Sequence, residues 1–121
     1  MFDHLGFSVA DLQKSKRFYL AALAPLGQGL VAEGNGWAMI GNESGRLWIG
    51  SHGLATSPFH IAIAANTRAQ VRAFYNAAMS AGGRDNGAPG IRADYAPNYY
   101  AAFVLDPDGH NLEAVCYQEF E

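Results

Sequence analysis

Two short segments of the chain alternate bulky apolar side chains with small or polar ones, a pattern typical of half-buried strands. Residues 2–9 place mainly bulky apolar side chains on one face and His4, among small residues, on the other. Residues 59–65 repeat the pattern, with His60 in the equivalent place. We expect both segments to be strands whose bulky face packs against another element.

A helical spacing of apolar residues follows each predicted strand. The first helix is expected to begin after Asp11, a suitable N-cap, and to end before Pro25. The second is expected to begin at the capping box of residues 67–70 and to end at the glycines 82–83. These helices are the partners that the bulky strand faces require.

Short apolar runs separated by turn residues follow each helix and predict three strands in each half. The expected strands cover residues 29–33, 36–41, 46–50, 90–94, 99–105 and 111–117. Between the last two, 106-DPDG-109 predicts a tight hairpin turn, because proline presets φ and Gly109 supplies a positive φ. Residues 84–98 form the least regular stretch.

The two halves of the chain resemble each other when shifted by 56 positions. This overlay places a histidine on a histidine and one aromatic pair on another: His4 on His60, and Phe18-Tyr19 on Phe74-Tyr75. We therefore expect an α+β fold with two β-α-β-β-β modules. The prediction is a single domain over residues 1–121, made of one module at 1–53 and a second at 57–121.

Composition narrows the class of protein. Half of the 121 residues are apolar and 16% are charged, which excludes intrinsic disorder. The net charge of −3 argues against a nucleic-acid-binding surface, and no apolar run is long enough for a membrane span. The single Cys116 excludes an internal disulfide and a cysteine zinc cluster. We expect a cytoplasmic protein with neither nucleic-acid nor membrane partners.

The ends of the two modules also correspond, and this brings candidate chemistry into view. With Leu47 placed on Leu112, Trp48 stands where the second module has Glu113. His4, His60 and Glu113 then lie on the strand faces turned away from the helices, and a cup formed by both sheets would gather them. Two imidazoles and a carboxylate suit a divalent Fe, Zn, Mn or Ni ion. The alternative is two half-buried histidines bonded to backbone, and the repeat makes the two interpretations about equally strong.

Three segments resemble one known superfamily. They are 3-DHLGFSVADLQKSKRFY-19, 60-HIAIA-64 and 103-FVLDPDGHNLEAV-115, and they look like the vicinal oxygen chelate superfamily of glyoxalases, bleomycin-resistance proteins and extradiol dioxygenases. The resemblance implies paired βαβββ modules forming a cupped, barrel-like mixed sheet with helices outside. It also implies that metal ligands come from the positions of His4, Trp48, His60 and Glu113.

The chain departs from the patterns of glyoxalase I and of the extradiol dioxygenases in that superfamily. Trp48 cannot bind a metal, so the four-ligand site of glyoxalase I is incomplete, and Glu113 would have to act as both ligand and catalytic base. Extradiol dioxygenases have a tyrosine where this chain has Phe103 and a histidine upstream, which residues 94–98 lack. No named activity transfers on the resemblance alone.

Two functions therefore stay open. The first is a metal-dependent lyase, isomerase or dioxygenase in which His4, His60 and Glu113 hold a divalent ion that chelates a small oxygen-rich substrate. The second is a metal-free binding or drug-sequestering protein that holds a flat apolar ligand. Aromatic residues are the candidates for contact with the small molecule: Trp37, Trp48, Tyr99 and Phe103. The low charge and the exposed strand edges of a cupped sheet favour a homodimer.

Overall fold

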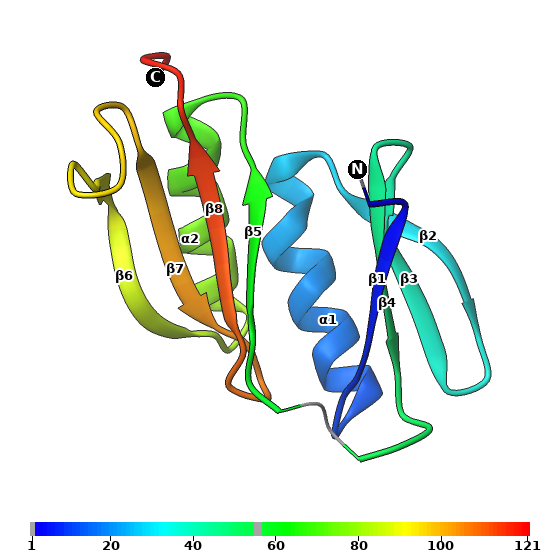
Figure 1. The fold of residues 1–121 in the computed structure, drawn as a ribbon. Helices are drawn as coiled ribbons and strands as arrows, with labels where there is room; N and C mark the ends of the chain where they lie inside the picture. Colours follow the sequence, from blue (N-terminus) through cyan, green and yellow to red (C-terminus); the bar gives the residue numbers. More distant parts are fainter. Residues whose placement is uncertain (1, 55–56) are drawn as a thin grey trace.

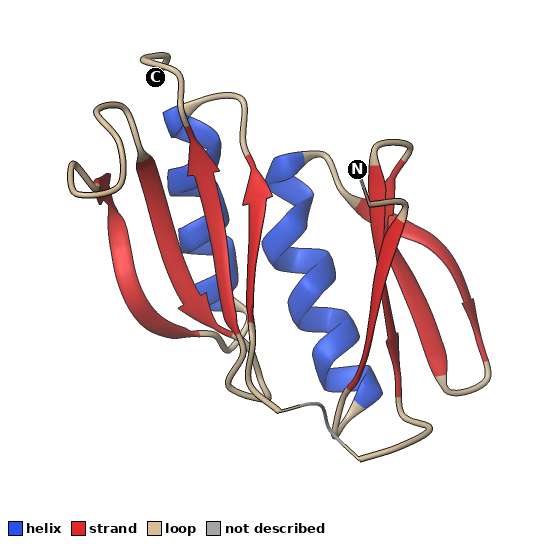
Figure 2. Ribbon diagram, in the orientation of Figure 1, coloured by secondary structure: helices blue, strands red, loops and turns tan. Residues whose placement is uncertain are grey.

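The computed structural model describes residues 2–54 and 57–121. Met1 and residues 55–56, which include the junction between the two predicted modules, lie outside the described residues. The elements follow one another in the order strand, helix and three strands, twice over (Figures 1 and 2). Their bounds are β1 His4–Ser8, α1 Leu12–Leu23, a 3₁₀ turn Ala24–Leu26, β2 Gly29–Gly34, β3 Trp37–Asn42, β4 Gly45–Gly50, β5 His60–Ala64, α2 Arg68–Ser80, β6 Arg84–Ile91, β7 Tyr100–Leu105 and β8 Asn111–Cys116.

The strands form two mixed sheets of four, with the orders β1-β4-β3-β2 and β5-β8-β7-β6. In each sheet the first strand pairs in parallel with the last, and the other neighbours are antiparallel. The sheets are cupped and do not close into a barrel. The expected α+β fold of two βαβββ modules is confirmed.

The register confirms the correspondence between the module ends. Gly6, two residues after His4, lies opposite Trp48 in the first sheet. Ala62, two residues after His60, lies opposite Glu113 in the second. Trp48 and Glu113 therefore occupy equivalent positions, as the alignment of the sequence predicts.

Both helices begin where the capping residues predict. The Asp11 side chain accepts a hydrogen bond from the backbone N–H of Lys14, and the Thr67 hydroxyl accepts one from that of Gln70. The apolar faces of α1 and α2 meet each other and the sheets in one continuous core. Helix α2 packs on the second sheet against β6, β7 and β8, and α1 packs on the first sheet against β2, β3 and β4 and also on α2 (Figure 1). None of the helices in the described part of the chain is long and apolar enough to cross a membrane.

Two local expectations are wrong. The strand that follows the helix of the second module was expected at residues 90–94, but β6 runs from Arg84 to Ile91. Two register shifts and the positive φ of Gly87 let this irregular stretch pair with β7, whose outer edge needs a partner. The sequence also favours a solvated His110 in the turn, yet its ring is buried and stacks on Phe59 with the ring centres 4.0 Å apart.

The buried bond between Tyr19 and Asp106 joins the two modules and gives a first prediction. The Tyr19 hydroxyl donates to Asp106 Oδ2 over 2.5 Å, and the other carboxylate oxygen accepts from the backbone N–H groups of Asp108 and His110. We expect Tyr19→Phe to lower the free energy of unfolding by about 1.5–3 kcal/mol, because a buried carboxylate loses a donor. Urea unfolding measures it, with the exposed Tyr95→Phe as the matched control. Equal stability of the two variants would contradict the structural role.

Candidate functional site

The second sheet brings His60 and Glu113 into direct contact. His60 Nε2 lies 2.6 Å from Glu113 Oε1, with the ring nitrogen donating to the carboxylate. The His60 side chain is 52% exposed, whereas that of Glu113 is buried. They come from neighbouring parallel strands, β5 and β8, and lie on the face turned away from α2. A buried carboxylate beside a solvent-facing imidazole is an arrangement that can hold a cation or a proton.

The phenol of Tyr99 completes the surroundings of Glu113. Its hydroxyl donates a hydrogen bond to Glu113 Oε2, so each carboxylate oxygen has one partner. Burial, and then the bond to Glu113, raises the pKa of Tyr99 above its usual range. The phenol therefore stays protonated through neutral and mildly alkaline pH and remains a donor to the carboxylate.

His4 lies apart from this pair. Its Nδ1 is 2.8 Å from Asp3 Oδ1, and this contact holds the pKa of Asp3 below its usual range. Within residues 2–54 and 57–121 of a single chain, no three His, Cys, Asp or Glu side chains gather closely enough to hold a metal ion. The structure therefore joins two of the three predicted ligands and leaves the third on the other sheet.

The four aromatic residues expected to contact the small molecule divide between the sheets. Trp48 lies on the His4 side of the first sheet, over Gly6 and Gly50, and stacks on His52 at 6.5 Å between ring centres. Trp37 is half-buried beside Gly34. Phe103 and Tyr99 pack together on the second sheet with Ala101 and Val115.

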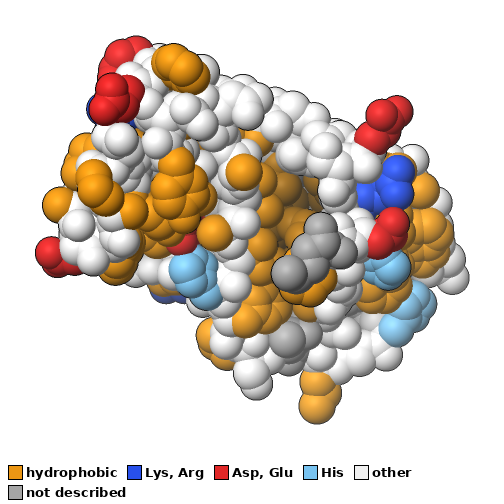
Figure 3. All heavy atoms as spheres, turned by 45° about the horizontal axis from the view of Figure 1, so that its top comes forward, with side chains coloured by type: hydrophobic (Ala, Val, Ile, Leu, Met, Phe, Trp, Pro, Cys, Tyr) orange, Lys and Arg blue, Asp and Glu red, His pale blue; other side chains and the backbone are white. Residues whose placement is uncertain are grey.

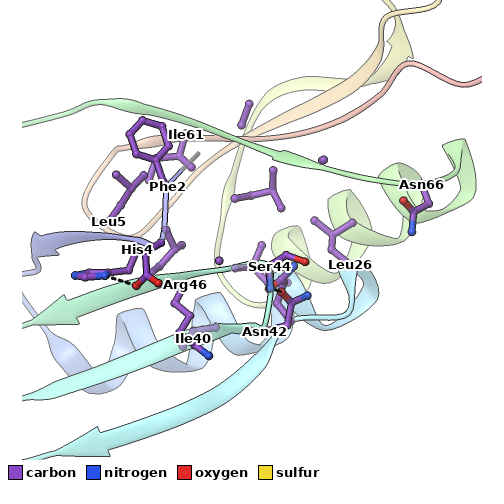
Figure 4. Close-up of a pocket in the computed structure, with 18 residues that line it drawn as sticks. Phe2, His4, Leu5, Leu26, Ile40, Asn42, Ser44, Arg46, Ile61 and Asn66 are labelled. Atoms are coloured by element: carbon purple, nitrogen blue, oxygen red, sulfur yellow. Dashed lines mark hydrogen bonds and ion pairs between the residues drawn. The ribbon is translucent and has the colours of Figure 1, made fainter.

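A cleft separates the edge strands of the two sheets. A cavity of about 400 Å³ lies between residues of β1 and β5 and reaches down to Leu23 and Leu26 in the core (Figure 4). Polar side chains, among them Asn42, Ser44, Arg46 and Asn66, stand around it. A second cavity of about 260 Å³ lies between the same strands and touches His60. Figure 3 shows the apolar hollow between the two halves of the molecule.

Tyr99 links Glu113 to two further tyrosines, Tyr95 and Tyr117, and the sequence did not predict this link. The Tyr99 ring meets those of Tyr95 and Tyr117 edge to face, at 5.1 and 5.2 Å between ring centres. Tyr95 lies in the turn after β6 and Tyr117 follows β8, so no periodic pattern links them. Tyr95 lies in the connection between β6 and β7, so its position depends on the pairing of these strands, and the sequence misplaced β6.

This arrangement can do two kinds of chemistry. Imidazole and carboxylate are suitable ligands for a divalent ion, and a buried carboxylate can take a proton from a bound substrate. The exposed Tyr95 and Tyr117 supply apolar area for a flat molecule, whereas Phe103, expected to contact it, is buried. Neither kind uses the Tyr99 hydroxyl directly, because that group is engaged with Glu113.

Comparisons with known proteins agree on one family. The sequence model of the glyoxalase/bleomycin resistance protein/dioxygenase superfamily matches residues 1–114. A crystal structure of a glyoxalase/bleomycin resistance protein from Albidiferax ferrireducens T118 is 32% identical, covers 96% of this chain and 98% of its own, and superposes with a TM-score of 0.83. No curated protein matches the chain.

Two more distant structures share the fold. A family enzyme from Burkholderia phytofirmans PsJN is 14% identical, with a TM-score of 0.77 over 96% of this chain and 98% of that one. Lactoylglutathione lyase from Agrobacterium tumefaciens is also 14% identical, with a TM-score of 0.70 over 96% of this chain and 92% of that one. At this level of identity the likeness concerns the architecture alone.

Proposed function

Because the chain belongs to the glyoxalase/bleomycin resistance protein/dioxygenase superfamily, we propose that it is a divalent-metal-dependent enzyme acting on a small oxygen-rich substrate. The observation that carries the proposal is the contact between His60 Nε2 and Glu113 Oε1. A buried carboxylate facing an accessible imidazole has a cost in desolvation that a bound cation would offset.

An imidazole nitrogen and a carboxylate oxygen are suitable ligand atoms for such an ion. Within the described part of one chain, only His60 and Glu113 of the three expected ligands lie together. His60 and Glu113 would hold the ion, which would supply Lewis-acid polarisation of two adjacent substrate oxygens. Fe, Zn, Mn and Ni all accept imidazole and carboxylate ligands. Glu113 Oε1 would take up or release the substrate proton, while Tyr99 holds Oε2.

We place the third ligand, His4, on a second copy of the chain. His4 and the His60–Glu113 pair lie on different sheets, and no third ligand joins the pair within the described part of one chain. Among the described strands β1 and β5 are edge strands that both border the cleft between the sheets, and a second copy can pack against such edges. The proposal is thus a cytoplasmic homodimer in which the first sheet of one protomer faces the second sheet of its partner.

The metal content of the purified, untagged protein tests this function. We expect a divalent ion that binds in proportion to protein, and its identity narrows the reaction. Iron would favour oxygen chemistry, although Phe103 stands where extradiol dioxygenases have a tyrosine. Zinc, nickel or manganese would favour a lyase or isomerase. Protein that contains no metal and takes up none on addition contradicts the proposal.

A metal-free binding protein is the second candidate, and the aromatic surface favours it. Tyr95 and Tyr117 are largely exposed and continue the Tyr99 ring toward solvent. Trp48 adds a half-buried ring on the other sheet. Binding of a flat apolar ligand that persists unchanged after removal of all metal would favour this function.

The Tyr99 hydroxyl gives a prediction specific to the metal-dependent function. We expect Tyr99→Phe to weaken metal binding by about 10–100-fold, because the variant frees Glu113 Oε2 and loosens the ligand. Competition against a chelating dye measures the affinity. Tyr117→Phe is the matched control, since Tyr117 packs on Tyr99 but makes no bond to Glu113. Unchanged affinity in Tyr99→Phe would show that the bond does not position the carboxylate.

A further inference from the structure

The path of β6 brings a cation onto the same face as His60 and Glu113. Arg92 follows directly on β6, and its backbone N–H bonds to the Tyr99 carbonyl over 2.7 Å. Its side chain turns back along the strand, where Nη2 donates to the Ala88 carbonyl over 2.7 Å. The guanidinium lies over the Phe103 ring, with Cζ 5.3 Å from the ring centre. A single backbone bond and a stacked ring thus hold its orientation.

Two glycines make the room for this guanidinium. A Cβ on Gly90 would lie 3.1 Å from Arg92 Nη1, and one on Gly87 would lie 3.1 Å from Nη2 and 2.9 Å from the Phe103 ring. Gly87 also has a φ of +150°, which side chains rarely adopt. The bulged, glycine-containing stretch of β6 is therefore shaped to receive Arg92 above the sheet.

The register aligns this cation with the candidate metal ligands. Ala62, Glu113, Phe103 and Gly87 are successive partners across β5, β8, β7 and β6. The His60 and Phe103 rings are 6.2 Å apart between centres, so Phe103 lies between His60 and the Arg92 guanidinium. One row across the sheet thus has the His60–Glu113 pair at one end and a positive charge at the other.

Arg92 has no acidic partner among the described residues. Arg68 and Arg72 both pair with Glu121, whereas no carboxylate in the described ranges forms an ion pair with Arg92. The nearby Asp85 accepts instead from Tyr75 and from the backbone of Gly87. The guanidinium keeps N–H groups in a planar fork, the geometry that binds carboxylate and phosphate oxygens.

We propose that Arg92 anchors an oxyanionic group, carboxylate or phosphate, of the small molecule that occupies the His60–Glu113 site. The ligand would lie beside the stacked Arg92 and Phe103 side chains, with its anionic end on Arg92 and its other oxygens toward His60. The substrate class is thereby narrowed to anions with a charged group about one aromatic ring away from the reacting oxygens. This inference deepens the proposed function. It rests on that function in one respect, namely that the ligand's other oxygens bind at the His60–Glu113 site.

The test uses metal-free full-length protein, so that anion binding is measured without the metal. Benzoate and inorganic phosphate serve as probes, with benzamide as the neutral match, and the side-chain Nε–H signal of Arg92 is followed by NMR. We expect saturable shifts with one or both anions and none with benzamide. The anion that binds identifies the group as carboxylate or phosphate. Absence of saturable binding by both would overturn the proposal.

Three variants distinguish specific anion binding at Arg92 from nonspecific attraction of anions to positively charged side chains. We expect Arg92→Gln to weaken anion binding about tenfold or more, while Arg84→Gln, on the exposed start of β6, leaves it unchanged. Gly90→Ala keeps the charge, but its Cβ would crowd Arg92 Nη1 and shift the guanidinium slightly, so it should weaken binding less than Arg92→Gln does. An equal loss in Arg84→Gln, or full binding in Arg92→Gln, would overturn the proposal.

Metal binding keeps the two proposals distinguishable. Arg92→Gln is expected to retain the metal content of the wild type, because Arg92 touches neither His60 nor Glu113 in the described contacts. If metal binds and anions do not, the anchor alone is refuted. If anions bind Arg92 and metal does not bind, the anchor stands and the metal-dependent function fails.

Discussion

Glu113→Gln is expected to remove the bound metal while leaving the fold intact. The change replaces a carboxylate that divalent ions prefer by an amide of nearly the same shape, which can still accept the Tyr99 bond. Loss of a partner that only orients a ligand already weakens metal binding by about 10–100-fold. Loss of the ligand itself should exceed that, so metal analysis by mass spectrometry should fall to background.

Two further proteins make this result interpretable. Glu43→Gln is the matched control, because it is the same substitution on an exposed carboxylate in the turn between β3 and β4. His60→Ala tests the site from its exposed side, where a change is least able to disturb the core. Circular dichroism checks that all variants fold. Metal retained at the wild-type level in both Glu113→Gln and His60→Ala would refute the site.

The periodicity of the chain was sufficient to predict most of the fold. Capping residues, Pro25 and the glycines after each helix place the helix ends correctly, because these signals act within a few residues. The repeat then gave the equivalence of Trp48 and Glu113, which the register confirms. Strand β6 was misplaced because its pairing depends on bulges around Gly87, and bulges leave no periodic signal.

The candidate site was predictable only in part, since it depends on how the modules are placed. Alternation along β5 and β8 put His60 and Glu113 on one face, and they lie in contact. The same rule put His4 on the equivalent face of β1, but it says nothing about the angle between the sheets. The Tyr99–Glu113 bond and the burial of His110 arise from loop geometry, which short-range patterns do not encode.

A mixed dimer of two metal-free variants is expected to bind metal, although neither variant does so alone. If His4 of one protomer completes the His60–Glu113 pair of its partner, a dimer of His4→Ala with His60→Ala carries one site with both defects and one intact site. Such a dimer, isolated by two different tags, should hold about one ion, against about two in the wild-type dimer. Both replaced side chains are about half exposed, so folding should be preserved.

A second mixed dimer supplies the control for this crossed arrangement. Pairing His60→Ala with Glu113→Gln breaks both sites, since these residues belong to the same pair, and this dimer should stay metal-free. A site built within one chain would leave both mixed dimers without metal. Metal in the first mixed dimer and none in the second would therefore place His4 across the dimer from its partner ligands. An exclusively monomeric protein, by light scattering, would refute the arrangement at once.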